Sequence, residues 1–149
     1  MRLFLIVQRV SRARGLPGVA SITGWARAAL SGSGAGTADV TVRLVAQAES
    51  ADLNKRYRGK RGATNVLSFT YGLAPGTTGL AGDLVICAPV VQREAVQQDK
   101  RPRAHWAHMV VHGILHLRGF DHVRKTDAEI MEALEIRILR RLGFSNPYA

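Results

Sequence analysis

Apolar residues recur along the chain with two different periods, and these periods predict a mixture of strands and helices. Where they occupy every second position, as Leu3, Leu5 and Val7 do, they indicate one face of a strand. Where they return every three or four positions, they indicate one face of a helix. The patterns predict, in order, a strand at 2–10, a helix at 17–30, a flexible connector at 31–36, a strand at 40–46, a short helix at 51–57, strands at 65–71 and 83–87, and helices at 90–98 and from about 104 to 117.

Local signals predict where several of these elements begin and end. Ser50 offers a cap to the short helix, and Gly59 is expected to end it. Thr126 and Glu129 have the spacing of a capping box and predict the start of a final helix, which Gly143 stops. The predicted buried stripe of this helix is Ile130, Leu134, Ile138 and Leu142.

The order of the elements predicts an α+β fold, with about four strands in a mixed sheet and about five helices, because strands and helices follow one another without regular βαβ alternation. The 149 residues fit a single domain spanning 1–149. A Gly-, Pro- and Thr-rich loop is expected after the third strand, and a basic loop at 99–104. The single cysteine, Cys87, excludes an internal disulfide and a zinc site built from several thiolates.

Charge and hydropathy narrow the class of partner. The chain carries 21 Lys and Arg against 11 Asp and Glu, a formal charge of +10, which favours a polyanionic partner such as nucleic acid. The alternative is that this charge only aids solubility or reflects an arginine-rich source proteome. The apolar run Leu3–Val7 is too short for a signal peptide, and no stretch predicts a membrane helix, so we expect a cytoplasmic protein without membrane contact.

All five histidines lie between His105 and His122, and three of them have the spacing of a metal site. Residues four apart on a helix share a face, so the imidazoles of His112 and His116 are expected to converge. Gly119 is expected to end the helix with a positive φ, so that the chain doubles back and presents His122. Three neutral imidazoles with a fourth position open to water form a catalytic zinc arrangement, so we predict one Zn²⁺ per chain at the end of this helix.

The surroundings of the predicted ligands suggest how the ion is held and used. Zinc lowers the pKa of bound water to about 7 and so supplies hydroxide. Asp121 is placed to accept the second N–H of a ligand imidazole, while His105 and His108 are assigned to packing or to contacts behind the ligands. Nickel, copper and iron also suit imidazole ligands, so zinc is a preference.

The same spacing overlaps the metzincin protease signature HExxHxxGxxH, which makes a metzincin-like metalloprotease one alternative. Gly113 replaces the glutamate that acts as general base in those enzymes. A glycine has no side chain to take a proton from the zinc-bound water, so this alternative is the weaker one.

Three blocks of the chain carry the motifs of one known family, in the family's order. They are LNKRYRGKRGATNVLSF at 53–69, GDLVICAPVVQREA at 82–95 and HGILHLRGFDH at 112–122. The first is similar to LNxxYRxKDxPTNVLSF and the last to HGxLHLxGyDH, so over roughly residues 40 to 143 the chain resembles the YbeY family of bacterial rRNA maturation endoribonucleases.

The resemblance implies a metal-dependent hydrolase with zinc held by three histidines on an α+β fold. It implies cleavage of single-stranded RNA, in maturation of the small-subunit rRNA end and in ribosome quality control. It also implies partners, namely the small ribosomal subunit, one of its proteins and an Era-type GTPase. A further alternative is a non-catalytic ribosome assembly factor in which zinc only braces the fold.

The family's functionally important arginine matches Arg58, whose guanidinium can hold phosphate oxygens and offset negative charge during catalysis. Its alternative role is to cap the preceding helix. Lys60 and Arg61 are expected to bind substrate by steering phosphates. Arg61 stands where the family has aspartate, and Ala63 where it has proline. The general base stays open between Asp121, a water and the RNA's own 2′-hydroxyl.

Overall fold

The computed structural model describes residues 1–72 and 78–149, and its elements follow the predicted order. The strands are β1 (Arg2–Arg9), β2 (Thr37–Val45), β3 (Val66–Thr70) and β4 (Gly79–Cys87). The helices are α1 (Val19–Leu30), α2 (Gln47–Arg58), α3 (Ala88–Gln97), α4 (Pro102–Leu117) and α5 (Lys125–Arg141).

The four strands form one mixed sheet in the order β1-β2-β4-β3. β1 and β4 both pair in parallel with β2, and β3 pairs antiparallel with β4 at the sheet's edge. This arrangement confirms the predicted α+β fold with four strands and five helices. It also places β3 beside α4, which matters for the site described below.

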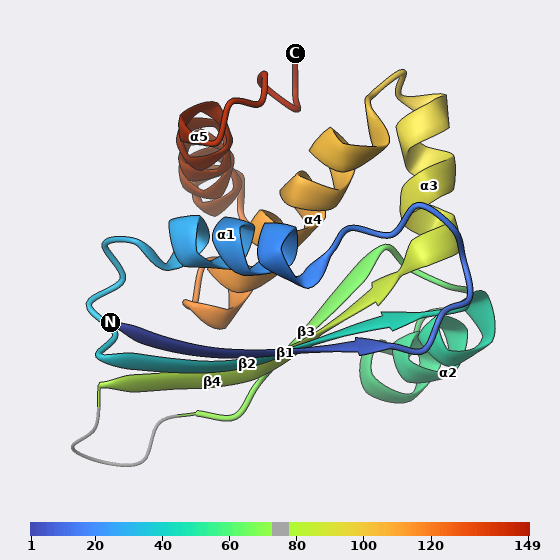
Figure 1. The fold of residues 1–149 in the computed structure, drawn as a ribbon, viewed down its shortest axis with the longest axis horizontal. Coiled ribbons are helices and arrows are strands. Elements are labelled where there is room, and N and C mark those ends of the chain that lie inside the picture. The colour runs from blue at the N-terminus through green and yellow to red at the C-terminus, as the bar shows by residue number, and fades with distance from the viewer. Residues whose placement is uncertain (73–77) are drawn as a thin grey trace.

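The two faces of the sheet are covered unequally. α1 and α4 lie across one face, with α5 packed against α4, while α2 lies on the opposite face (Figure 1). The main core lies on the first face, where Val42, Leu44 and Leu84 of the strands are fully buried. A smaller core around Val45 and Cys87 lies on the other side, where Leu53 of α2 packs against it.

The start of α2 differs from the prediction. The helix begins at Gln47 and ends at Arg58, and the following Gly59 takes the left-handed conformation as expected. Ser50 is buried inside the helix and does not cap it; its hydroxyl exchanges two hydrogen bonds with the backbone of Thr64. A tertiary partner therefore decides the position of this residue, whereas the sequence suggested a local role.

The start of α5 also differs. Arg124 occupies the N-cap position without a side-chain capping bond, so the predicted capping box at Thr126 is wrong. Of the predicted stripe, Ile138 is buried and Leu134 and Leu142 pack partly buried against the core, but Ile130 is exposed. The other buried side chains lie about one position along, at Met131, Glu135 and Leu139. Gly143 has a positive φ just beyond the helix, as predicted.

Other boundaries move by a few residues. α1 begins at Val19, after Pro17, and α4 begins at Pro102, inside the predicted basic loop. β2 and β4 each begin earlier than predicted because their first residues pair with each other from Thr37 and Gly79 onward. The loop expected after the third strand lies largely outside the described residues.

Over the described ranges, none of the helices has the length and apolar character needed to cross a membrane.

Candidate metal centre

Helix α4 is the central helix of the fold, because its sequence is apolar on nearly every side. It packs between α1, α3, α5 and the sheet, and most of its residues are buried. Gly113 lies where the helix comes closest to the strands: a Cβ at this position would stand 2.8 Å from a methyl group of Leu84. The close approach fixes the height of the neighbouring His112 above the sheet.

The end of α4 forms the turn that the sequence predicted. Gly119 has φ of +97°, and the backbone N–H of Phe120 donates to the carbonyl of Leu115 at 3.0 Å. This bond closes the helix in the manner of a glycine-based C-cap. The chain then reverses and brings His122 next to the last turn of the helix.

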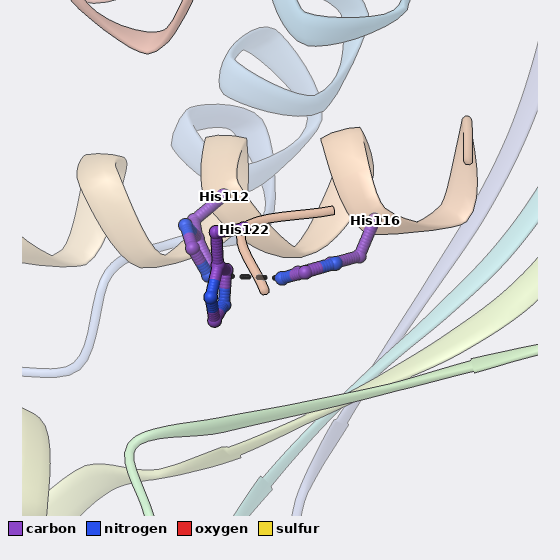
Figure 2. A group of neighbouring side chains, drawn as sticks. All are labelled: His112, His116 and His122. Atoms are coloured by element: carbon purple, nitrogen blue, oxygen red, sulfur yellow. Dashed lines mark hydrogen bonds between the residues drawn. The ribbon is translucent and has the colours of Figure 1, made fainter. Parts of the chain in front are cut away.

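The three predicted ligands meet at this turn. Figure 2 shows the rings of His112 and His122 side by side, with the ring of His116 directed toward them. One donor nitrogen of each of these three residues lies within 4.8 Å of the other two. The Nε2 atoms of His112 and His116 are 3.1 Å apart.

This spacing fits a bound cation. Two nitrogens on a tetrahedral zinc at about 2.0–2.1 Å stand about 3.3 Å from each other. Glu135 lies 3.3 Å from Nδ1 of His112. With Nδ1 of His112 protonated toward Glu135, its Nε2 presents a lone pair to the neighbouring ring, and a cation between the rings is the natural complement.

The pKa of His116 is shifted in the direction that a metal ligand requires. Burial lowers it, and the neighbouring His112 and His122 lower it further, while the Phe120 backbone and Asp121 oppose the change less strongly. The ring is therefore neutral near pH 7 and keeps a lone pair for a metal. These three histidines could hold a metal ion.

The histidines form one wall of a cleft of about 740 Å³. The opposite wall comes from the end of α2 and from β3, and it includes Arg58, Asn65 and Ser68. Arg58 is exposed in the last turn of α2, and within the described parts of the chain its guanidinium makes a single long hydrogen bond, of 3.5 Å, to Asn54. The fold thus brings Arg58 and the three histidines, which are separated by more than fifty residues in the chain, to one cavity.

Lys60 and Arg61 lie further out. Both are exposed in the turn after α2, and neither belongs to the cleft lining that the structure describes. Because they are exposed and outside this lining, their positive charge suits long-range attraction of an anion better than contact at the histidines.

Asp121 lines the cleft, but its contact differs from the one expected. Its Oδ1 accepts the backbone N–H of His122 at 2.7 Å, which holds the turn that presents this ligand. No ring N–H among the described histidines donates to it within hydrogen-bond distance.

The carboxylate that meets a ligand ring is Glu135, which the sequence analysis missed. It is 1% exposed, and the hydrogen bonds with His108 and His112 outweigh the effect of its burial and lower its pKa to about 2. An acidic residue next to the buried stripe of α5 was the available signal, but the predicted stripe included Leu134 and left out its neighbour Glu135.

The other two histidines of α4 bind carboxylates too. Nε2 of His105 lies 2.9 Å from Glu94, and Nε2 of His108 lies 2.5 Å from Glu135. Both rings are buried, which agrees with the packing role expected for them.

Comparison with known proteins places the chain in a family. Residues 20–143 match the family described as Endoribonuclease YbeY. A Methylococcus capsulatus protein named Endoribonuclease YbeY is 54% identical over 145 residues, which cover 97% of this chain and 94% of the relative. A protein of the same name from Alteromonas mediterranea is 52% identical, over 89% of this chain and 85% of its own.

A solved structure shares the fold. The solution structure of a Thermotoga maritima protein superposes with a TM-score of 0.53 at 22% identity, and the alignment covers 93% of this chain and 92% of that protein. This likeness concerns the arrangement of strands and helices alone. The sequence relatives carry the assignment further: the chain belongs to the YbeY endoribonuclease family, whose members are hydrolases of the nuclease class.

Proposed function

We propose that this protein is a zinc-dependent endoribonuclease that cuts single-stranded RNA, in maturation of the small-subunit rRNA end and in ribosome quality control. The observation that carries the proposal is the cleft in which three convergent imidazoles face Arg58. The relatives' name, Endoribonuclease, and the charge of +10 support an RNA substrate. The proposal places the protein in the cytoplasm with the small ribosomal subunit, one of its proteins and an Era-type GTPase as partners.

His112, His116 and His122 are the residues that would hold the zinc ion. A zinc ion there would supply a Lewis acid and a source of hydroxide near neutral pH. Three neutral ligands leave its charge uncompensated, which favours an anionic phosphodiester in the cleft. Zinc is preferred over nickel, copper or iron because a set of three imidazoles with an open position is its usual catalytic arrangement.

Arg58 is proposed to bind the scissile phosphate from the opposite wall. Its guanidinium can donate two parallel hydrogen bonds to phosphate oxygens and stabilise the charge that grows on them during cleavage. Asn65 and Ser68 add polar groups beside it, although Asn65 also donates to Glu94 and Ser68 donates to the carbonyl of Gly113.

Three groups are proposed for the role of general base in the cleavage reaction: Asp121, a water, and the RNA's own 2′-hydroxyl. Oδ1 of Asp121 is used by the backbone of His122, and the second oxygen remains for a proton in the cleft. A substrate with a 2′-deoxyribose at the cleavage position tests the role of the 2′-hydroxyl, because only a mechanism that uses this group requires it.

The deciding experiment incubates purified protein of known metal content with one RNA in single-stranded and duplex form. We expect the single strand to be cut, and chelation to stop the reaction until zinc is restored. Intact RNA with a zinc-loaded protein would favour the non-catalytic assembly factor. Cleavage of casein in place of RNA would favour the metalloprotease, despite the missing base at Gly113.

A further inference from the structure

We infer that Glu135 is a positioning residue that fixes the ring of His112 for metal binding, and that His108 and Tyr148 hold Glu135 in place. The inference rests on the proposed metal site. It adds to the proposed site a set of supporting contacts from α5 and from the segment that follows this helix.

The contacts of Glu135 are divided between its two oxygens. Oε1 faces Nδ1 of His112 at 3.3 Å. Oε2 meets Nε2 of His108 at 2.5 Å and accepts the phenol O–H of Tyr148 at 2.9 Å. The carboxylate is almost completely buried, so water cannot replace these partners.

The contact with His112 is the one that concerns the metal. Nδ1 and Nε2 lie on opposite sides of the imidazole ring, so a proton held on Nδ1 by Glu135 leaves the lone pair on Nε2. The Nε2 atom is the one that faces His116 in the cleft. A carboxylate behind a ligand histidine also increases the basicity of the ring, and its buried negative charge attracts the cation.

The same atoms could be read as a second metal site, because donors of His108, His112 and Glu135 lie within 4.8 Å of one another. The distances favour hydrogen bonds. Two ligands of one zinc ion stand about 3.3 Å apart, whereas Nε2 of His108 and Oε2 of Glu135 are in direct hydrogen-bond contact, closer than two ligands of one ion. The three residues therefore support the ligand set and do not form another.

The chain contains a matched control for this role. Glu94 binds His105 as Glu135 binds His108, and both histidines are buried on α4. Glu94 contacts none of the three proposed ligands among its hydrogen bonds in the described structure. Replacing either carboxylate disturbs a buried histidine, but only Glu135 should affect the metal.

The experiment measures the zinc affinity of full-length wild type, Glu135→Gln, Tyr148→Phe and Glu94→Gln by competition with a chromophoric chelator. We expect Glu135→Gln to bind zinc about 10–100-fold more weakly and Tyr148→Phe a few-fold more weakly. The zinc affinity of Glu94→Gln should stay within about twofold of the wild-type value. Wild-type affinity in Glu135→Gln, or an equal loss in Glu94→Gln, would overturn the inference.

A second measurement needs no variant. In ¹⁵N-labelled wild type loaded with zinc, long-range ¹H–¹⁵N spectra should show His112 protonated at Nδ1 and metal-bound through Nε2. The opposite assignment would overturn the inference even if Glu135→Gln failed to fold. If wild type binds no zinc, or if His116→Ala binds it equally well, the proposed metal site itself is wrong, which is a different outcome.

Discussion

Helix α4 carries two pairs of histidines that differ in what stands opposite them. The first pair, His105 and His108, is buried, and each ring meets a carboxylate at hydrogen-bond distance. The second pair, His112 and His116, borders an open cleft, and its nearest ring partners in that cleft are other imidazoles. In the first pair a carboxylate occupies Nε2 of each ring, whereas in the second pair Nε2 of His112 and Nε2 of His116 face each other and can turn their lone pairs toward a cation.

The comparison predicts first that the two pairs respond differently to substitution. His116→Ala should reduce RNA cleavage to background and remove stoichiometric zinc, because one of three ligands is lost. His105→Gln should retain RNA cleavage and stoichiometric zinc, because the amide can still donate a hydrogen bond to Glu94. Cleavage assays and metal analysis on the same preparations test this. An active, zinc-free His116→Ala would remove the metal from the mechanism.

Substitutions in the wall opposite the histidines should lower the rate of RNA cleavage and leave metal binding unchanged. Arg58→Ala is expected to reduce kcat about 10²–10³-fold with zinc content preserved, as when one donor to a developing oxyanion is lost. The control is Arg56→Ala, on the same helix but paired with Asp52 and outside the described cleft lining. Equal losses in both variants would mean that only general positive charge is needed.

The two buried carboxylates should differ in their effect on stability. Glu135→Ala is expected to lower the free energy of unfolding of the metal-free protein by about 3 kcal/mol, because it leaves buried partners unsatisfied. Glu94→Ala should cost about 1 kcal/mol, since the Glu94 side chain is 25% exposed and water can replace it. Urea denaturation measures both values, and a larger loss in Glu94→Ala would contradict the ranking.

The smallest expected effect is on the pH dependence of the free energy of unfolding. Burial lowers the pKa of His105 below 6.5, against the raising effect of Glu94. Below about pH 6.5 the unfolded chain therefore binds this proton more readily than the folded one, and stability is lost as pH falls, by at most about 1.4 kcal/mol per pH unit. His105→Gln should flatten this part of the curve in urea denaturation of metal-free protein between pH 5 and 7 (a window of about two units around the ordinary value). An unchanged slope would show that other groups cause it.

The parts of the site that the sequence could predict are those set by local geometry. His112 and His116 are one helical turn apart, and a glycine three residues later permits the reversal that brings in His122, so their convergence needs no knowledge of the rest of the fold. The strands and helices were predicted in the right order for the same reason, because their apolar periods are local.

The parts that were missed depend on distant partners. Ser50 looked like a cap, but Thr64 takes both its hydrogen bonds. Glu135 was overlooked because the apolar stripe of α5 was placed one residue away from the face that α4 actually covers. Asp121 was assigned to a ligand ring on the basis of adjacency in sequence, and its oxygen contacts the backbone.

Gly113 has a consequence for how this scaffold can evolve. This glycine stands where the protease motif has its general-base glutamate, and a Cβ added to it would lie 2.8 Å from a methyl group of Leu84 and 3.3 Å from Val66. A glutamate cannot enter there unless buried neighbours of the sheet are rearranged at the same time. A Gly113→Glu change alone would therefore have to displace the buried Leu84 side chain, so packing as well as chemistry sets this motif apart from the protease motif.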